Sequence, residues 1–178
     1  MNSETIAQSR PVGSNNGSRL LQRRSPRARS GWVADSAITI PVGTPRDEDL
    51  RQLETAERAL AAGIAAARPG NHVGDISAAI GGVIRDAGYG VNTAFGGHGV
   101  GRTMHEPPDV PNDGVAGRGL ALRPGLVIAI EPWFLAARPD IYIDRDGWTI
   151  RSVDRSRGVH VEHTVAITAD GPVVLTAR

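Results

Sequence analysis

The distribution of hydrophobic and polar positions divides the 178-residue chain into a polar N-terminal segment and a patterned remainder. Residues 1–29 show neither helical nor strand periodicity and are rich in Ser, Asn, Arg, Gly and Pro, a composition that predicts disorder. From about residue 30 the hydrophobic positions recur regularly. We therefore expect a disordered segment over residues 1–29 and one folded domain over residues 30–178.

Two amphipathic helices are predicted between residues 44 and 88. The first begins at Thr44, a suitable N-cap, with Pro45 at the first helical position. Its apolar stripe is Leu50, Leu53, Leu60 and Ile64, and the second helix repeats apolar residues at three- and four-residue spacing over residues 76–87 until Gly88.

Short strands flank these helices. Residues 35–42 alternate, residues 126–130 are continuously apolar, residues 141–143 form a short apolar run, and residues 159–168 alternate again. The pattern predicts an α+β domain in which two helices pack on a mixed or antiparallel sheet.

Composition narrows the class of protein. The formal net charge is +1, which gives no global case for binding a specific nucleic acid, although residues 1–30 hold six Arg and one acid, Glu4. The longest apolar run is much too short to span a membrane. The chain has no Cys, which excludes disulfides and thiolate metal sites and favours a reducing compartment, so we expect a cytoplasmic protein.

The densest candidate chemistry lies in residues 96–108, GGHGVGRTMHEPP. Glycines around His98 let the backbone approach a ligand closely, and His105 follows seven residues later. The motif lacks the Lys and Ser/Thr that close a phosphate-binding loop. Taken alone, it also suits an ordinary turn that carries two surface histidines.

Three carboxylates stand at strand ends or on polar strand faces. Glu131 ends the apolar run 126–130, Glu162 alternates with apolar neighbours, and Asp35 opens residues 35–42. Each alone could be an edge or solvent-facing residue. With His98 they form an oxygen-rich ligand set that suits Mn²⁺, Fe²⁺ or Co²⁺ better than a thiolate zinc site.

At this point the chain resembles a known family. GHGVGRTMHEPP, PGLVIAIEPWF and DGWTIRSVDRSRGVHVEHTVAIT, preceded by GWVADSAITIPVG, are similar to the type I methionine aminopeptidases over residues 31–178. The resemblance implies the pita-bread fold, with the first half incomplete, around a centre of two divalent metal ions. It also implies removal of the N-terminal methionine from nascent polypeptides, near the ribosome.

The resemblance assigns roles residue by residue. It implies that Asp35, His98, Glu131 and Glu162 are metal ligands, and that Glu131 is also the general base of hydrolysis. His105 would contact the substrate at the scissile amide. In the substrate pocket, Trp148 matches an aromatic and Met104 stands where some relatives have Phe.

One position departs from the family pattern. The family has a further Asp ligand eleven residues before the bridging one, and here that position is Arg24. His160 also replaces a common Gln. Ligands for a single ion remain, and we expect a chain that lacks the first strands of the fold because of a truncated or misread gene start. The alternatives are a weak or inactive pita-bread pseudoenzyme that acts as a binding module and, less well matched, an Xaa-Pro aminopeptidase.

Overall fold

A computed structural model describes residues 19–25, 27–147 and 149–177. Its main sheet has seven strands in the order β1-β4-β13-β8-β6-β7, with β14 paired to β13, and every pairing is antiparallel. The strands are β1 (Arg19–Arg24), β4 (Ser36–Val42), β6 (Gly96–Gly99), β7 (Glu106–Pro111), β8 (Val127–Ile130), β13 (Glu162–Thr168) and β14 (Gly171–Val174).

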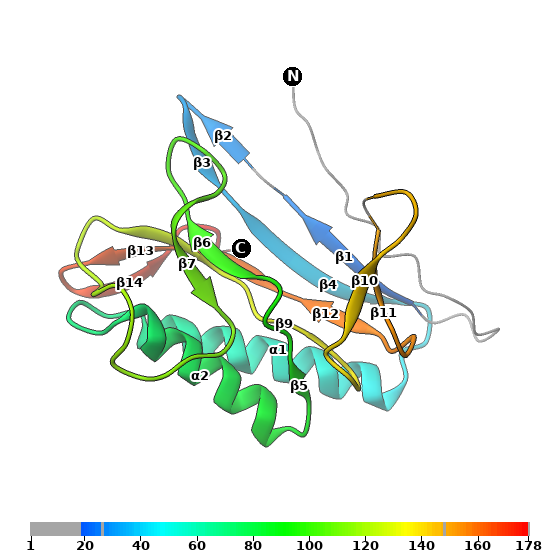
Figure 1. The fold of residues 1–178 in the computed structure, drawn as a ribbon. Coiled ribbons are helices and arrows are strands. Elements are labelled where there is room, and N and C mark those ends of the chain that lie inside the picture. The colour runs from blue at the N-terminus through cyan, green and yellow to red at the C-terminus, as the bar shows by residue number, and fades with distance from the viewer. Residues whose placement is uncertain (1–18, 26, 148, 178) are drawn as a thin grey trace.

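Smaller sheets extend this framework. Strand β12 (Gly158–His160) pairs with β9 (Trp133–Leu135), which pairs with β5 (Gly90–Val91). Two hairpins project from the body in Figure 1, namely β10 (Ile141–Ile143) with β11 (Ile150–Ser152), and β2 (Arg27–Arg29) with β3 (Trp32–Ala34).

The two helices, α1 (Asp47–Ala66) and α2 (Val73–Asp86), lie together on one side of the sheet, as Figure 1 shows. Their buried residues meet those of the sheet in one core, in which Ile76, Ile80 and Ile84 of α2 are fully buried with Ile128 and Ile130 of β8. This arrangement confirms the predicted α+β class and leaves the opposite side of the sheet uncovered by these helices. Within the described residues, neither helix is long and apolar enough to cross a membrane.

The first helix differs from its prediction at its start and on its buried face. It begins at Asp47 with Arg46 as the N-cap, not at Thr44, and Leu50 is 46% exposed. The buried face instead carries Asp49, which forms ion pairs with Arg46 and Arg157. With Asp49 turned inwards, the next residue, Leu50, points outwards.

The segment before Asp35 also differs from its prediction. Residues 19–24, for which the sequence predicted disorder, form β1 along the edge of β4, with Leu20 buried and Arg24 opposite Ala37. Backbone pairing supplies this strand's hydrogen bonds, so it forms without the alternating side chains that the prediction required. A strand therefore does precede Asp35, although the sequence suggested that it was missing.

Candidate metal centre

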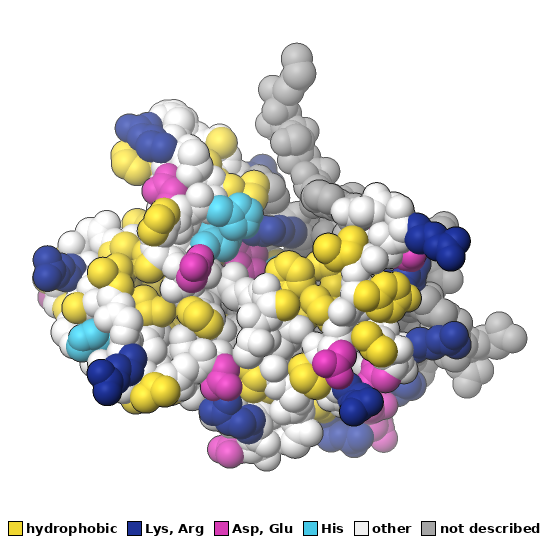
Figure 2. All heavy atoms as spheres, in the orientation of Figure 1, with side chains coloured by type: hydrophobic (Ala, Val, Ile, Leu, Met, Phe, Trp, Pro, Cys, Tyr) yellow, Lys and Arg dark blue, Asp and Glu magenta, His cyan; other side chains and the backbone are white. Residues whose placement is uncertain are grey.

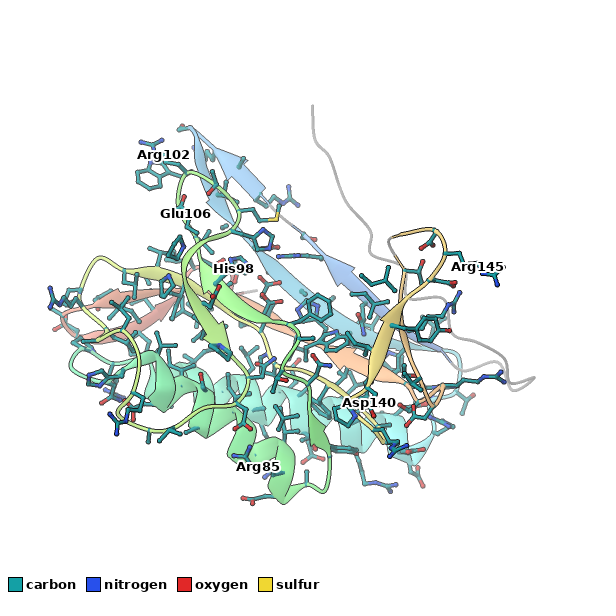
Figure 3. All side chains as sticks on the ribbon, viewed as in Figure 1. Arg85, His98, Arg102, Glu106, Asp140 and Arg145 are labelled. Carbon is teal, nitrogen blue, oxygen red and sulfur yellow. The ribbon has the colours of Figure 1, made fainter. Side chains whose placement is uncertain are left out.

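The four predicted ligands converge because their strands are neighbours. Asp35 immediately precedes β4, Glu162 opens β13, Glu131 follows β8, and His98 lies in β6, and these four strands are consecutive in the sheet order. Residues up to 127 positions apart in the sequence therefore reach one place through the pairing of the sheet. Figure 3 shows His98 on the part of the sheet that lies away from the two helices.

His98 is held in one orientation by its own strand. Its side chain is buried, and Nδ1 lies 2.9 Å from the carbonyl oxygen of Gly99, so Nδ1 carries the proton and Nε2 is free to accept a bond. Nε2 faces the carboxylate of Glu131, 3.4 Å from Oε1. Gly97 allows β6 to lie this close to β8, because a Cβ at this position would be 2.0 Å from the carbonyl oxygen of Ala129.

Asp35 is fully buried and held by backbone contacts. Its N–H donates to Thr164 Oγ1 at 2.8 Å, and its Oδ1 accepts from the N–H of Ser36 at 2.9 Å. Its Oδ2 accepts from Arg24 Nε at 2.7 Å. The carboxylate therefore has a fixed orientation, and one of its oxygens is already bound by a cationic side chain.

Glu162 is fully buried, and neither of its carboxylate oxygens has a hydrogen-bond partner among the described residues. Arg24 Nε and His160 Nε2 each lie 3.8 Å from Oε2. Burial, together with the charges of Glu131 and Asp35, raises the pKa of Glu162 to about 9 against the opposing effect of Arg24. An unsatisfied buried carboxylate of this kind is costly unless a proton or a cation accompanies it.

His160 joins the cluster from the end of β12. Its Nε2 lies 3.0 Å from Glu131 Oε2, and its side chain is 12% exposed. The sequence placed His160 on the same strand face as Glu162, two positions further on, but did not indicate that it is part of the ligand cluster.

Arg24, which the sequence placed at the position of the family's further Asp ligand, also lies in the cluster. Its Nη2 lies 2.5 Å from Asp35 Oδ2 and 3.4 Å from Nε2 of both His98 and His105. Burial opposes its charge, but the hydrogen bond to Asp35 and the nearby carboxylates raise the pKa of Arg24 above its ordinary value. A guanidinium therefore lies inside the cluster where the family pattern has a carboxylate.

The predicted substrate-contacting residues lie at the rim or outside the described chain. The ring centre of His105 is 4.1 Å from that of His98, and burial together with the electrostatic effects of His98 and Arg24 lowers the pKa of His105, which favours its neutral form. Met104 is half-buried beside it in sequence. Trp148 lies outside the described residues. Figure 2 shows histidine, acidic and basic side chains gathered at the centre of one face, next to hydrophobic side chains.

The donor chemistry fits a divalent cation. Two groups of side chains bring their potential ligand atoms within 4.8 Å of one another, namely Asp35–His98–Glu162 and Glu131–His160–Glu162. Carboxylate oxygens and imidazole nitrogens suit divalent transition metals, and the unpartnered oxygens of Glu162 require a positive partner. Arg24 occupies the Asp35 side of this donor set.

Fold and donor set together define a metallopeptidase-like domain, and the family comparison agrees. The model of metallopeptidase family M24 matches residues 24–169, and the chain belongs to this family. The fold is accordingly the pita-bread fold. The chain covers only a part of each of the solved proteins with this fold. The expected resemblance to methionine aminopeptidases is confirmed.

Among the relatives, methionine aminopeptidase 1 of Mycobacterium tuberculosis is 43% identical over 152 residues, which are 82% of this chain and 57% of that protein. The Aquifex aeolicus methionine aminopeptidase is 43% identical with the same coverage. The chain thus spans little more than half the length of these relatives. Among solved structures, the Thermotoga maritima methionine aminopeptidase superposes with a TM-score of 0.87 at 34% identity, over 89% of this chain and 64% of that one. A Pyrococcus furiosus prolidase superposes with a TM-score of 0.71 at 28% identity, over 89% of this chain and 41% of the prolidase.

Proposed function

We propose that this chain is a metal-dependent aminopeptidase that removes the N-terminal methionine from nascent polypeptides and peptides. The observation that carries the proposal is the buried, unpartnered carboxylate of Glu162 within a cluster of two further carboxylates and three imidazoles. A fully satisfied structural ion-pair network would not leave both oxygens of a buried Glu without a partner. The relatives that share the family are named methionine aminopeptidases.

The ligands that the family pattern carries to this chain are Asp35, His98, Glu131 and Glu162. Their oxygen and nitrogen donors suit Mn²⁺, Co²⁺ or Fe²⁺. We propose that one ion rather than two is bound, on the side of Glu131 and Glu162, because Arg24 occupies the side of Asp35 and His98. Such an ion, when bound, supplies Lewis acidity and makes water a stronger nucleophile at neutral pH.

The protein's own residues have distinct tasks in this scheme. Glu131 lies at the centre of the cluster between His98 and His160, and its carboxylate can take the proton of the attacking water. His105 is exposed at the rim and is kept neutral by its surroundings, so its N–H can donate to the oxyanion that develops at the scissile carbonyl.

Apolar side chains near the cluster suit a methionine side chain. Phe95 and Trp133 pack edge to face, with ring centres 5.3 Å apart, and each is within three residues of His98 or Glu131 in the sequence. The hydrophobic side chains beside the histidines in Figure 2 offer the same kind of surface. A thioether side chain packs favourably against aromatic rings.

A second candidate function rests on Arg24. Because this guanidinium already binds Asp35 and lies near two histidines, it can neutralise the cluster without any metal ion. The chain would then be a pseudoenzyme that keeps the pita-bread fold as a binding module.

Methionine release separates the two functions. The full chain, freed of metal and then supplied with Mn²⁺ or Co²⁺, should release methionine from Met-Ala-Ser, and Glu131→Gln should abolish the release. His163→Gln is the matched control, because His163 lies on β13 but its Nδ1 faces Thr176 Oγ1 at 2.9 Å. No release with any of the metals would favour the binding module. Preference for a Met-Pro peptide over Met-Ala would instead indicate a prolidase-like specificity.

A further inference from the structure

Two candidate ligand groups share Glu162 but differ in their other members. One consists of Asp35, His98 and Glu162, and the other of Glu131, His160 and Glu162. The shared carboxylate cannot serve both groups equally if only one ion binds. The contacts of each group decide which one a cation occupies.

Arg24 already fills the first group. Its Nη2 lies 2.5 Å from Asp35 Oδ2 and 3.4 Å from His98 Nε2, the two atoms that an ion would need there. A divalent ion bound to those atoms would lie against the guanidinium, and two positive charges so close together repel strongly in a buried site. Arg24 cannot lose its charge by deprotonation at physiological pH.

Arg24 is more distant from the second group, where its Nε lies 3.8 Å from Glu162 Oε2. His160 Nε2 lies 3.0 Å from Glu131 Oε2 and 3.8 Å from Glu162 Oε2, so the three side chains face one another. Both oxygens of Glu162, which the two groups share, are buried without a hydrogen-bond partner among the described residues, so Glu162 can accept a cation on the side where Arg24 does not bind.

The backbone holds His160 in place for this role. Its N–H donates to Thr39 Oγ1 at 3.0 Å, and its carbonyl oxygen accepts from the same hydroxyl at 2.7 Å. Thr39 belongs to β4, so the end of β12 is fixed to the main sheet. A ligand presented by a fixed backbone loses little freedom when an ion binds.

We propose that His160 is a direct ligand of a single divalent transition-metal ion, which it holds together with Glu131 and Glu162. The ligand set inferred from the family resemblance does not contain His160. The inference deepens the proposed function, on which it rests for the presence of a cation. The competing explanation is that His160 only donates a hydrogen bond to Glu131 and helps to orient it.

Nitrogen NMR of the full chain with ¹⁵N-labelled histidine distinguishes these explanations without any substitution. Zn²⁺ serves as a diamagnetic probe. The Nε2 resonance of His160 should move on addition of Zn²⁺ and Nε2 should lose its proton, whereas the ring nitrogens of His163 should not respond. A shift confined to His98, or no response of His160, would overturn the inference.

Affinity measurements give a second, independent readout. Equilibrium dialysis against Mn²⁺ should show that His160→Gln, which keeps a hydrogen-bond donor near Glu131, weakens binding by more than the roughly 10- to 100-fold that is typical of losing a residue that only orients a ligand. His163→Gln should leave the affinity unchanged. Unchanged affinity in His160→Gln, or no binding by the unaltered chain, would contradict the proposal. If His160→Gln does not fold, the NMR experiment on the unaltered chain decides.

These results are separable from those on activity. Ion binding through His160 without release of methionine would refute the aminopeptidase function and leave His160 as a ligand. Methionine release with no NMR response of His160 would refute His160 as a ligand and leave the aminopeptidase function in place.

Discussion

Replacing Arg24 by Met tests whether the guanidinium serves as a built-in cation of the cluster. Met keeps much of the volume of the aliphatic stem and removes the charge. Arg24 makes two short contacts with Asp35 Oδ2, from Nε at 2.7 Å and Nη2 at 2.5 Å, and Asp35 is fully buried. The substitution therefore leaves a buried carboxylate without its only close positive partner among the described residues.

The expected cost follows from this burial. Removing one partner of a buried ion pair typically costs about 3–5 kcal/mol of unfolding free energy. The Arg24 side chain is 26% exposed, so solvent already screens part of the interaction. We therefore take the lower end, about 3 kcal/mol, which corresponds to a fall in Tm of roughly 6–12 °C for a domain of this size.

A divalent ion should recover much of this loss. Without Arg24, the oxygen of Asp35 and Nε2 of His98 become accessible to Mn²⁺, which replaces the missing charge. A ligand at one hundred times its Kd stabilises the folded state by about 2.7 kcal/mol. Mn²⁺ should therefore stabilise Arg24→Met more than it stabilises the unaltered chain.

Urea unfolding followed by tryptophan fluorescence, in EDTA and in excess Mn²⁺, measures both effects. Arg29→Ala is the matched control, because Arg29 is exposed in the neighbouring β2. The reasoning is refuted if Arg24→Met in EDTA is within about 0.5 kcal/mol of the unaltered chain, the range of ordinary surface substitutions. It is also refuted if Mn²⁺ stabilises both proteins equally.

Two further predictions concern the scaffold around the site. Asp49→Asn should lower the free energy of unfolding in urea by about 2 kcal/mol. Burial disfavours the charged form of Asp49, but hydrogen bonds from Arg46 and the charge of Arg157 outweigh burial and lower the pKa of Asp49. The stability that Asp49 contributes is complete above its unfolded-state pKa of about 4 and is lost as pH falls through the lower folded-state pKa. The unfolding free energies of Asp49→Asn and the unaltered chain should therefore converge in acid. A difference that grows in acid would contradict this reasoning. Gly97→Ala places a Cβ 2.0 Å from a carbonyl oxygen of β8 and should cost about 3 kcal/mol of unfolding free energy or prevent folding. The control Gly82→Ala lies in α2, where an added Cβ meets nothing within 4 Å, and should stabilise the protein by about 0.5–1 kcal/mol. Equal thermal stability of the two variants would show that the close approach of β6 and β8 is unimportant.

Local patterns predicted most of the scaffold. The second helix and the strands around residues 36–42 and 127–130 follow from periodicity, because the side chains that define each element are near neighbours in sequence. Predictions failed where a distant partner overrides the local pattern. Leu50 is exposed because Asp49 turns inwards to meet Arg157, and residues 19–24 form a strand because β4 offers them an edge.

The sequence by itself indicated four candidate metal ligands, two helices and several of the strands, since residue type and short-range spacing are written in it. Only the tertiary structure decided the state of the cluster. It brought Arg24 against Asp35, buried Glu162 without a hydrogen-bond partner, and set His160 beside Glu131. The two contacts join residues 11 and 29 positions apart, and their strength depends on burial and on exact neighbours, which no local pattern contains.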